Sequence, residues 1–383
     1  MPEEIYDIIV IGSGAAGMFA CIHSSPTLKK VLLEKNNALG KKVLLSGGER
    51  CNVSNISINP EEDYFGKNKK ALYSLFKKFS NYDMISWLEE RWVQTHIEDR
   101  GRIILHSGKS QELLVLLKKE LALAGTEIRL NTPILDVEKE GEIFTVHSEW
   151  EIFYGRKVIV STGGKSFAQV GTDGWGFRMA EKFGIKLVDP YKWLCALVTR
   201  QDLSPLSGTT VFLEVQIYDD NKEIYREYGS FLFTHFGISG PLIFNGVLKI
   251  GEVLRDKWIG SDGELAYMRE HIKVKLVFNE EHMTKKIRDF FGFKEWPHPN
   301  SLLKSWEGEK MEAWLDVNDM RTWAEAKVTG GWIELDELTN TFESKKIPGL
   351  YFIGEVLDLT GKTGWFNLQV AWSEGYVVGK SLG

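Results

Sequence analysis

The chain has 383 residues, of which 43% are hydrophobic and 26% charged, and its formal net charge is -6. This balance is that of an ordinary globular protein, and the negative charge argues against nucleic acid as its partner. No apolar run approaches the ~18 residues of a membrane span, and MPEEIYDIIVIG lacks the basic start of a signal peptide. The three cysteines are far apart and form neither a CxxC pair nor a Cys/His metal pattern. We therefore expect a cytoplasmic protein without a metal site.

The first predicted element is a strand in YDIIVIGSGAAG, which ends in the motif G-x-G-x-x-G. In this motif the first glycine permits a tight turn, the second lets a pyrophosphate approach the backbone, and the third lets the next helix pack closely. A second strand, KKVLLEK, ends in an acid whose carboxylate is placed to accept hydrogen bonds from ribose hydroxyls. The pattern predicts a dinucleotide site at Gly12, Ser13, Gly14, Ala15, Ala16, Gly17, Glu34 and Lys35.

After the second strand, the sequence favours FAD over NAD as the dinucleotide. An NAD domain usually continues with further strand–helix units, whereas this chain runs into GKKVLLSGGERCNVSN. The small residues Ser46, Gly47 and Gly48 would bring backbone amides to the pyrophosphate or the flavin edge. Arg50 and Asn52 add hydrogen-bond donors. The alternative is a glycine-rich connector with Arg50 in a surface ion pair. Cys51 either faces the flavin or is a small buried hydrophobic residue.

Helical and strand patterns alternate over the next hundred residues. Residues 66–95 predict amphipathic helices, and a clearer helix follows in QELLVLLKKELALAG. The short basic groups at 67–70 and 77–78 are interpreted as solvated surface. Three strand-like runs then end in VIVSTGG, where the chain is expected to return to the cofactor. This return assigns Thr162, Gly163 and Gly164 to the cofactor site.

The pattern changes at about residue 190, where apolar and polar residues begin to alternate between turns. This alternation predicts antiparallel strands in a small barrel or sandwich, and residues 280–320 are richer in helix formers. Within the barrel region, His235 lies among turn-forming residues in THFGISGP. It either supplies a proton near a flavin or hydrogen-bonds backbone groups to shape the loop.

The C-terminal stretch again follows the pattern of a dinucleotide domain. In IPGLYFIGEVLD a strand leads through Gly354 to Glu355 and Asp358, and a glycine loop then enters a final amphipathic helix. In an FAD fold, such an acid binds the ribityl hydroxyls and the helix N-terminus faces the flavin. This interpretation predicts flavin contact by Asn367, Leu368 or Gln369, with a plain N-cap role for Asn367 as the alternative.

Taken together, SGGERCNVSN, LFTHFGISGP, AEAKVTGGWIELDEL, FESKKIPGLYFIGEVLD and GWFNLQVAWSEGYVVG resemble the BaiN/YhiN-type NAD(P)/FAD-dependent oxidoreductases. The resemblance spans nearly the whole chain and implies an FAD domain of the two-dinucleotide-binding-domain type, an inserted β-barrel and a small helical insert. Two departures lie beside the expected flavin, where Glu49 stands for a glycine and Trp365 for the second glycine of Gly-Gly-Tyr-Asn. The predicted FAD-binding set also includes Lys42 and Ile134.

These observations predict an α/β protein with a Rossmann-like FAD-binding domain, an inserted antiparallel β-barrel and a small helical subdomain. The expected boundaries are 1–190 for the first part of the FAD domain, 191–280 for the barrel, 281–320 for the helical insert, and 321–383 for the return to the barrel edge and the FAD domain. Together these parts form one FAD domain interrupted by an insertion.

Three classes of function remain open from the sequence. No second G-x-G-x-x-G follows residue 40, so NAD(P)H would act as a transient reductant rather than occupy its own Rossmann domain. The favoured class is an FAD-dependent oxidoreductase that acts on a small unsaturated or carbonyl compound, with His235 or Cys51 as the catalytic candidates. The alternatives are an RNA-modifying flavoprotein and a non-catalytic FAD-binding redox module.

Overall fold

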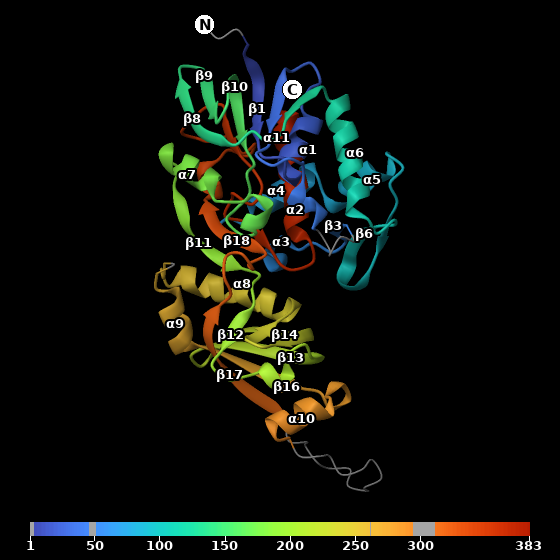
Figure 1. The fold of residues 1–383 in the computed structure, drawn as a ribbon, viewed down its shortest axis with the longest axis vertical. Helices are drawn as coiled ribbons and strands as arrows, with labels where there is room; N and C mark the ends of the chain where they lie inside the picture. The colour runs from blue at the N-terminus through green and yellow to red at the C-terminus, as the bar shows by residue number, and fades with distance from the viewer. Residues whose placement is uncertain (1–3, 46–50, 261, 294–310) are drawn as a thin grey trace. The chain divides into compact units, whose positions relative to one another are not determined.

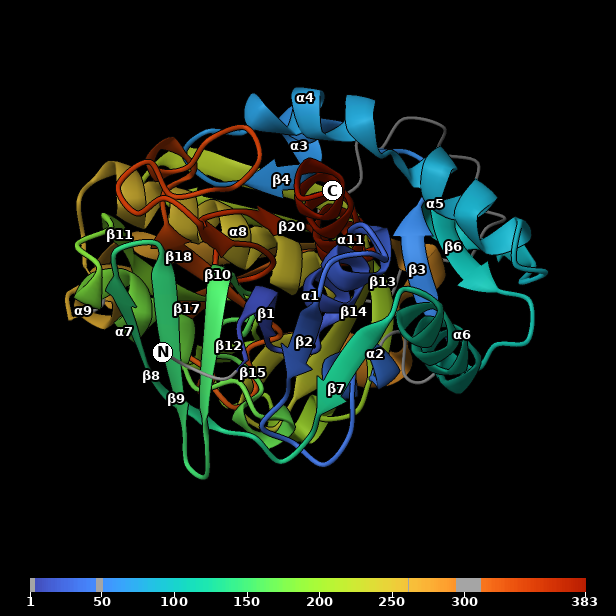
Figure 2. The same ribbon diagram turned by 90° about the horizontal axis from the view of Figure 1, so that it is seen from above.

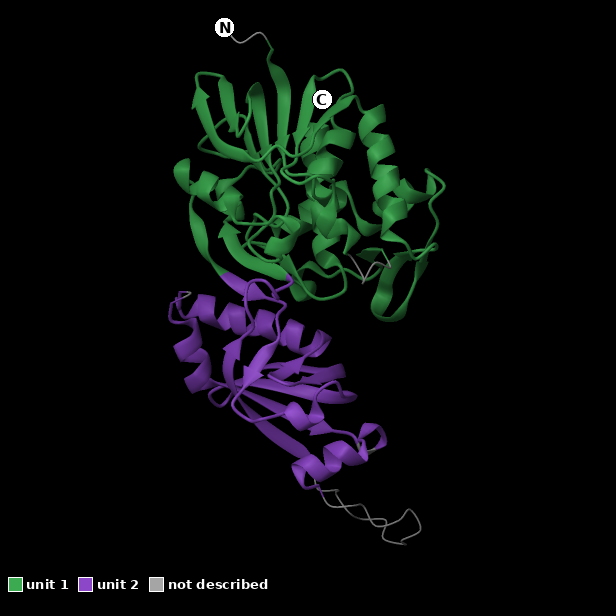
Figure 3. Cartoon of the chain, viewed as in Figure 1, with its two compact units in different colours: residues 1–190, 328–383 green, residues 191–327 purple. Residues whose placement is uncertain are grey.

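A computed structural model describes residues 4–45, 51–260, 262–293 and 311–383 of the protein (Figure 1). The chain divides into two compact units, which are described separately (Figure 3). Unit 1 comprises residues 1–190 and 328–383, and unit 2 comprises residues 191–327. Two stretches of sequence that lie far apart therefore build unit 1 together.

Unit 1 is organised around a sheet that has seven strands among the described residues. Figure 2 shows six of them side by side in the order β8, β9, β10, β1, β2 and β7. The seventh, β19, pairs in parallel with the end of β10, whereas β9 pairs antiparallel with its beginning. The bounds are β1 Tyr6–Ile11, β2 Lys30–Leu33, β7 Thr126–Arg129, β8 Ile134–Glu140, β9 Ile143–Ser148, β10 Ile152–Val160 and β19 Leu350–Phe352.

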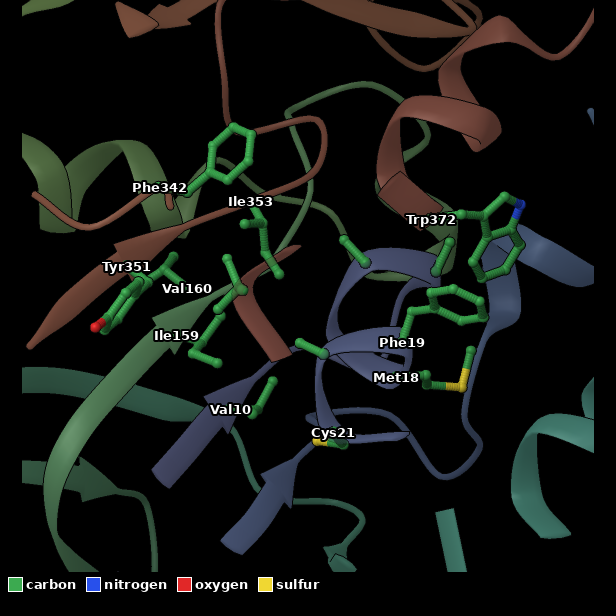
Figure 4. Packing of buried hydrophobic residues seen from close by; sticks show 14 of the residues in the cluster. Val10, Met18, Phe19, Cys21, Ile159, Val160, Phe342, Tyr351, Ile353 and Trp372 are labelled. Atoms are coloured by element: carbon green, nitrogen blue, oxygen red, sulfur yellow. The ribbon is translucent and has the colours of Figure 1, made fainter. Parts of the chain in front are cut away.

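Helices α1 and α11, from the two ends of the chain, pack against each other in this unit. Helix α1 is short and α11 is long, and glycines on α11 allow the close approach. A Cβ at Gly375 would lie 2.5 Å from the carbonyl oxygen of Ala16, and one at Gly379 would lie 2.7 Å from that of Ala20. In the core beside them, the rings of Phe19 and Trp372 are 5.2 Å apart (Figure 4). The bounds are α1 Ala15–His23 and α11 Phe366–Ser381.

The remaining helices and short strands of unit 1 surround this core. Strands β3, β6 and β5 form a small sheet, β4 pairs with β20, and β11, which runs on into unit 2, pairs with β18. The helices are α2 Lys41–Leu44, α3 Pro60–Asp63, α4 Ala71–Lys78, α5 Asn81–Glu89, α6 Ser110–Leu123 and α7 Trp175–Lys182. The strands are β3 Asn52–Asn55, β4 Tyr64–Phe65, β5 Thr95–Ile97, β6 Arg102–Leu105, β11 Leu187–Trp193, β18 Val328–Ile333 and β20 Thr360–Gly361.

Unit 2 is a closed antiparallel barrel of six strands within its described residues. The strands close in the order β12, β15, β14, β13, β16 and β17, and residues such as Leu213, Val215 and Ile217 of β13 are fully buried. The strands are β12 Leu197–Thr199, β13 Thr210–Asp219, β14 Lys222–Thr234, β15 Gly237–Ser239, β16 Ile272–Phe278 and β17 Glu312–Met320. The helices are α8 Pro241–Asp256, α9 Glu264–His271 and α10 Lys285–Phe291.

This architecture confirms the predicted fold class, a Rossmann-like domain with an antiparallel β-barrel, but corrects the helical insert expected over 281–320. Helix α10 is present at the start of that range, residues 294–310 lie outside the described part, and the end of the range is barrel strand β17. In β17, Ala313, Leu315 and Val317 are buried at alternate positions. This period of two is that of a strand with one face in a core, and composition alone did not reveal it.

Candidate functional site

The turn between β1 and α1 has two glycines that the protein's own packing requires and one that it does not. Gly12 has a φ of +102°, and a Cβ there would lie 2.6 Å from the carbonyl oxygen of Ser161; a Cβ at Gly17 would clash with the carbonyl oxygen of Gly12. At Gly14 the nearest atom to a Cβ would be 3.9 Å away. The space above Gly14 is therefore open, as the close approach of a pyrophosphate to a helix N-terminus requires.

Glu34, directly after β2, is buried and its carboxylate helps to hold this turn in place. One carboxylate oxygen accepts from the backbone N–H of Ser13 at 3.0 Å and from the Ser13 hydroxyl. The other accepts from the backbone and side-chain nitrogens of Asn36 at 2.8 and 2.7 Å. A ribose hydroxyl would join or replace these donors. The neighbouring Lys35 forms an ion pair with Asp173 at 2.9 Å.

A second turn, after β19, gathers side chains from four parts of unit 1. Glu355 forms an ion pair with Lys42, and its other oxygen accepts from the Ser166 hydroxyl at 2.9 Å and from the backbone N–H of Thr329 at 3.0 Å. Just before it, the backbone N–H of Gly354 donates to the buried carboxyl of Glu374 on α11 at 2.5 Å. The structure thus brings together Glu355 and Lys42, two residues assigned separately to the cofactor.

The glycines after β10 and the acid at the end of the second turn have defined places. A Cβ at Gly164 would clash with the side chain of Thr329, whereas Gly163 is a left-handed residue with a φ of +74°. The carboxylate of Asp358 is buried and accepts from the backbone N–H of Lys67 at 3.1 Å. The hydroxyl of Thr162 has no hydrogen-bond partner among the described residues. Ile134 begins β8.

Helix α11 begins at Phe366, so its first backbone N–H groups point out of its end and carry positive potential. Asn367 is not the N-cap; its side-chain oxygen accepts from the backbone N–H of Gly361 at 2.8 Å and its nitrogen donates to the same residue's carbonyl at 2.9 Å. The N-cap is Trp365, in a left-handed conformation with a φ of 74°, which costs about 1–2 kcal/mol for a residue with a side chain.

The other two α11 residues assigned to the cofactor face different surroundings. The side chain of Gln369 is fully buried, accepts from the Ser54 hydroxyl at 2.6 Å and donates to Ser373 at 3.0 Å. Leu368 is partly buried against the core. The Asn367 and Gln369 side chains therefore fix the start of the helix, and the predicted flavin contact by Asn367, Leu368 or Gln369 stays a prediction.

Asn52 gives the clearest sign that a ligand belongs here. Its side chain is completely buried in β3, yet neither its amide oxygen nor its nitrogen has a hydrogen-bond partner among the described residues. A buried polar group left unpaired costs about 1–3 kcal/mol, so native proteins rarely keep one without a partner. Together with the open space at Gly14 and the positive potential at the start of α11, this unpaired amide shows that the residues present fit FAD.

Several assigned residues lie elsewhere or outside the described part. Ser46, Gly47, Gly48 and Arg50, with Glu49, fall outside it. Cys51 is fully buried and its carbonyl accepts from Leu105, so the structure shows its burial without testing a redox role. His235 lies in unit 2, exposed in the turn from β14 to β15, with its ring 5.0 Å from that of Phe236. Its predicted role as proton donor stays a prediction.

Sequence reasoning missed the residues that support the second turn. Thr329 accepts from the backbone N–H groups of Lys165 and Ser166 at 2.8 and 3.0 Å, and Glu374 reaches Gly354 from the middle of α11. Burial raises the pKa of Glu374 to about 8. A lone acid within the apolar pattern of the last helix was the available signal for Glu374, whereas no local pattern pointed to Thr329.

Near the start of α11, unit 1 also has an open hollow of about 610 Å³. It is lined in part by Asn55, Ser57, Asn81, Tyr82, Arg100 and Phe366.

Among the described residues no cluster of His, Cys, Asp and Glu could hold a metal ion. In the same part of the chain, no helix combines the length and apolarity needed to cross a bilayer.

Comparison with known protein families decides the relationship. The family described as "HI0933-like protein Rossmann domain" matches residues 6–381. The chain belongs to this family. This membership confirms the resemblance to the BaiN/YhiN-type proteins that the sequence motifs indicated.

Members and solved structures similar to the chain cover it from end to end. A ribosomal RNA dihydrouridine synthase of Escherichia coli is 28% identical, with 99% of this chain and 98% of that protein aligned. A 3-dehydro-bile acid delta(4,6)-reductase of Clostridium scindens is 24% identical, with 97% and 98% aligned. The solved structure of the 3-ketosteroid-delta4-(5alpha)-dehydrogenase of Rhodococcus jostii RHA1 aligns with 100% of this chain over 97% of its own length. The sequence identity is 14% and the TM-score is 0.55, which shows a shared fold. In class, the chain is a flavin-dependent oxidoreductase.

Proposed function

We propose that this protein uses FAD to reduce a carbon–carbon double bond that is conjugated to a carbonyl group. Such a reduction adds a hydride to one carbon and a proton to the other. The observation that carries the proposal is the buried amide of Asn52, which has no partner among the described residues, in a unit whose dinucleotide turn is open at Gly14. The full-length relatives support the reaction type, because the uracil ring and a 3-dehydro steroid with a delta4 bond both contain such a double bond.

The chain's own residues would bind and orient the cofactor. The backbone N–H groups at the start of α1 would bind the pyrophosphate, and Glu34 the adenosine ribose. The Glu355 turn would face the ribityl chain, and the end of α11 would stabilise negative charge on the flavin. FAD, when bound, supplies the hydride, and NAD(P)H is proposed as the transient donor that replenishes it.

His235 is proposed as the group that delivers the proton to the substrate. A histidine can hold a proton near neutral pH and release it in the transition state. The His235→Asn variant should keep normal FAD content and melting temperature while turnover falls by roughly 10²-fold, the range of general acid catalysis. Unchanged turnover, or loss of FAD together with stability, would return His235 to a role in shaping the turn.

The first candidate substrate is a small unsaturated carbonyl compound, as the sequence predicted. The reductase of Clostridium scindens supports this class. A second candidate is a uridine of ribosomal RNA, supported by 28% identity over nearly the whole chain to dihydrouridine synthases of Escherichia coli and Haemophilus influenzae. Reduction of uridine at its conjugated double bond gives dihydrouridine, so one catalytic site would suit either substrate.

The test uses anaerobically photoreduced holoprotein, mixed separately with a panel of small enones and with ribosomal RNA. Return of the oxidised flavin spectrum with one class, together with a product that has gained two hydrogens, assigns the substrate. A separate anaerobic titration with NADH and NADPH measures reduction of the flavin. If neither donor reduces it and neither substrate class oxidises it, the protein is a non-catalytic FAD-binding module and the proposal is wrong.

A further inference from the structure

The segment from Tyr64 to Tyr82 is strongly basic in a chain that is acidic overall. It contains five lysines, at 67, 69, 70, 77 and 78, and no Asp or Glu, whereas the whole chain has a net charge of -6. The sequence alone predicts that these lysines are solvated surface residues. Their place in the fold suggests more than solvation.

The basic segment is fastened directly to the second cofactor turn. Strand β4 at its start pairs with β20, so that Tyr64 lies opposite Gly361. The hydroxyl of Tyr64 donates to the carbonyl of Phe366, the first residue of α11, at 3.0 Å. The backbone N–H of Lys67 donates to Asp358 at 3.1 Å. Helix α4, which follows, packs on α11 in unit 1 (Figure 2).

Helix α4 presents a basic and aromatic face to solvent. Leu72, Leu75 and Phe79 are buried on its inner side. Lys70, Tyr73 and Lys77, spaced at i, i+3 and i+7, lie on the outer side, where Tyr73 is 47% exposed. This spacing places the three side chains in one row along a helix.

The lysines of this face are not neutralised by neighbouring acids. Among the described residues, Lys70, Lys77 and Lys78 form no ion pair, and the ammonium group of Lys78 contacts only the carbonyl of Asn340, at 3.4 Å. Lys67, by contrast, is paired with Glu334 at 2.6 Å. Three cations that lack carboxylate partners, with a tyrosine between them, match the needs of a phosphate backbone and a stacked base.

We propose that the outer face of α4, formed by Lys70, Tyr73, Lys77 and Lys78, binds the phosphate backbone of the RNA substrate. This inference rests on the second candidate substrate of the proposed function, a uridine in ribosomal RNA. The face would hold RNA beside the second cofactor turn, to which β4 and Lys67 are hydrogen-bonded. These lysines would attract the phosphates locally, although the net charge of the chain is negative.

The test is the triple variant Lys70→Ala/Lys77→Ala/Lys78→Ala of the holoprotein. Alanine keeps the helix because it has the highest helix propensity. A matched control, Lys109→Ala/Lys118→Ala/Lys119→Ala, removes the same charge from exposed lysines at α6. Binding of a uridine-rich single-stranded RNA and of ribosomal RNA is followed by fluorescence anisotropy over a series of salt concentrations.

We expect the α4 variant to bind RNA at least roughly tenfold more weakly than the parent protein. The slope of log K against log salt concentration should become shallower by about 2, because each contact with a single-strand phosphate contributes about 0.7 to this slope. The α6 control should bind within about twofold of the parent protein if the lysines act locally. Equal losses in both variants, or no RNA binding by the parent protein, would overturn the proposal. The proposal would also be wrong if the three lysine substitutions weakened binding to anionic phospholipid vesicles but left RNA binding unchanged, because the face would then bind a membrane surface.

Reduction is measured separately so that the two proposals can fail separately. Lysine-dependent RNA binding supports the docking face even when photoreduced protein fails to reduce the bound RNA, in which case the uridine substrate is wrong. If the α4 variant reduces ribosomal RNA with unchanged affinity and rate, the proposed uridine substrate is supported and the proposed docking face is wrong. A small enone should be reduced equally well by both variants and the parent protein.

Discussion

The two turns assigned to the cofactor, Gly12–Gly17 and Gly354–Asp358, are fixed in different ways. In the first, Gly12 and Gly17 are required because Ser161 and the turn's own carbonyls leave no room for a Cβ, and one side chain, Glu34, accepts from Ser13. In the second, side chains from distant segments hold the turn, among them Lys42, Ser166 and Glu374. The first turn is therefore recognisable from one short segment of sequence, although Ser161 packs on it from the end of β10, whereas the second is held by side chains from across unit 1.

The largest expected effect separates the roles of two glycines in the first turn. Gly17→Val places a side chain against the Gly12 carbonyl and the Ser161 hydroxyl, so we expect no folded protein. Gly14→Ala has room within the protein and should fold. Its methyl group would occupy the space of the pyrophosphate, so FAD affinity should fall by roughly 100-fold. Soluble yield and melting temperature, followed by FAD titration, test both.

Equal loss of stability in the two glycine variants would contradict this distinction. Retained FAD affinity in a folded Gly14→Ala variant would show that the dinucleotide does not approach the backbone there.

This contrast also explains how far the sequence could predict the molecule. The motif of Gly12, Gly14 and Gly17, the strand before it and Glu34 lie within one short segment, so their spacing alone predicted the turn. The fold class followed from alternating and helical patterns in the same way. The ion pair of Lys42 with Glu355, the brace from Thr329 and the strand at Glu312–Met320 depend on partners far away in the chain. No local periodicity records those partners.

The second prediction concerns the buried carboxyl of Glu374, which supports Gly354. Its ordinary pKa of 4.5 is raised to about 8 by burial, so it is protonated at neutral pH in the folded state. In the unfolded chain the carboxyl loses this proton at lower pH. The free energy of unfolding therefore keeps its whole contribution from Glu374 below the ordinary pKa and falls as the pH rises toward the pKa of the folded state. The fall is about 1.4 kcal/mol per pH unit inside that window. Glu374→Gln should remove this slope.

Denaturant unfolding of the apoprotein at several pH values between the two pKa values measures this effect. The exposed Glu181→Gln variant on α7 is the control and should retain the slope of the parent protein. If the unfolding free energy of Glu374→Gln depends on pH as strongly as that of the parent protein, the carboxyl is ionised in the folded state. The second turn would then be held by a charge rather than by a neutral hydrogen bond.

The smallest expected effect compares two lysine ion pairs. Lys42 pairs with Glu355, whose side chain is 17% exposed, whereas Lys35 pairs with Asp173, which is 50% exposed. Lys42→Met should destabilise the protein by about 1–2 kcal/mol because Glu355 keeps a half-desolvated charge without its partner. Lys35→Met should cost less than about 0.5 kcal/mol, since exposed pairs contribute little. Equal losses of unfolding free energy in the two variants would contradict this difference between the more buried and the more exposed ion pair.

The pairing of α1 with α11 has a consequence for biogenesis. The ribosome makes β1 and the glycine turn first, but the helix that covers them and the acid turn beside it come from the last stretch of the chain. At a synthesis rate of about 5–20 residues per second, the N-terminal segment is made on the order of 20–70 seconds before its C-terminal partner. Nascent chains that stop before Phe366 should therefore never acquire flavin, and the yellow cofactor would mark only molecules whose translation has passed α11.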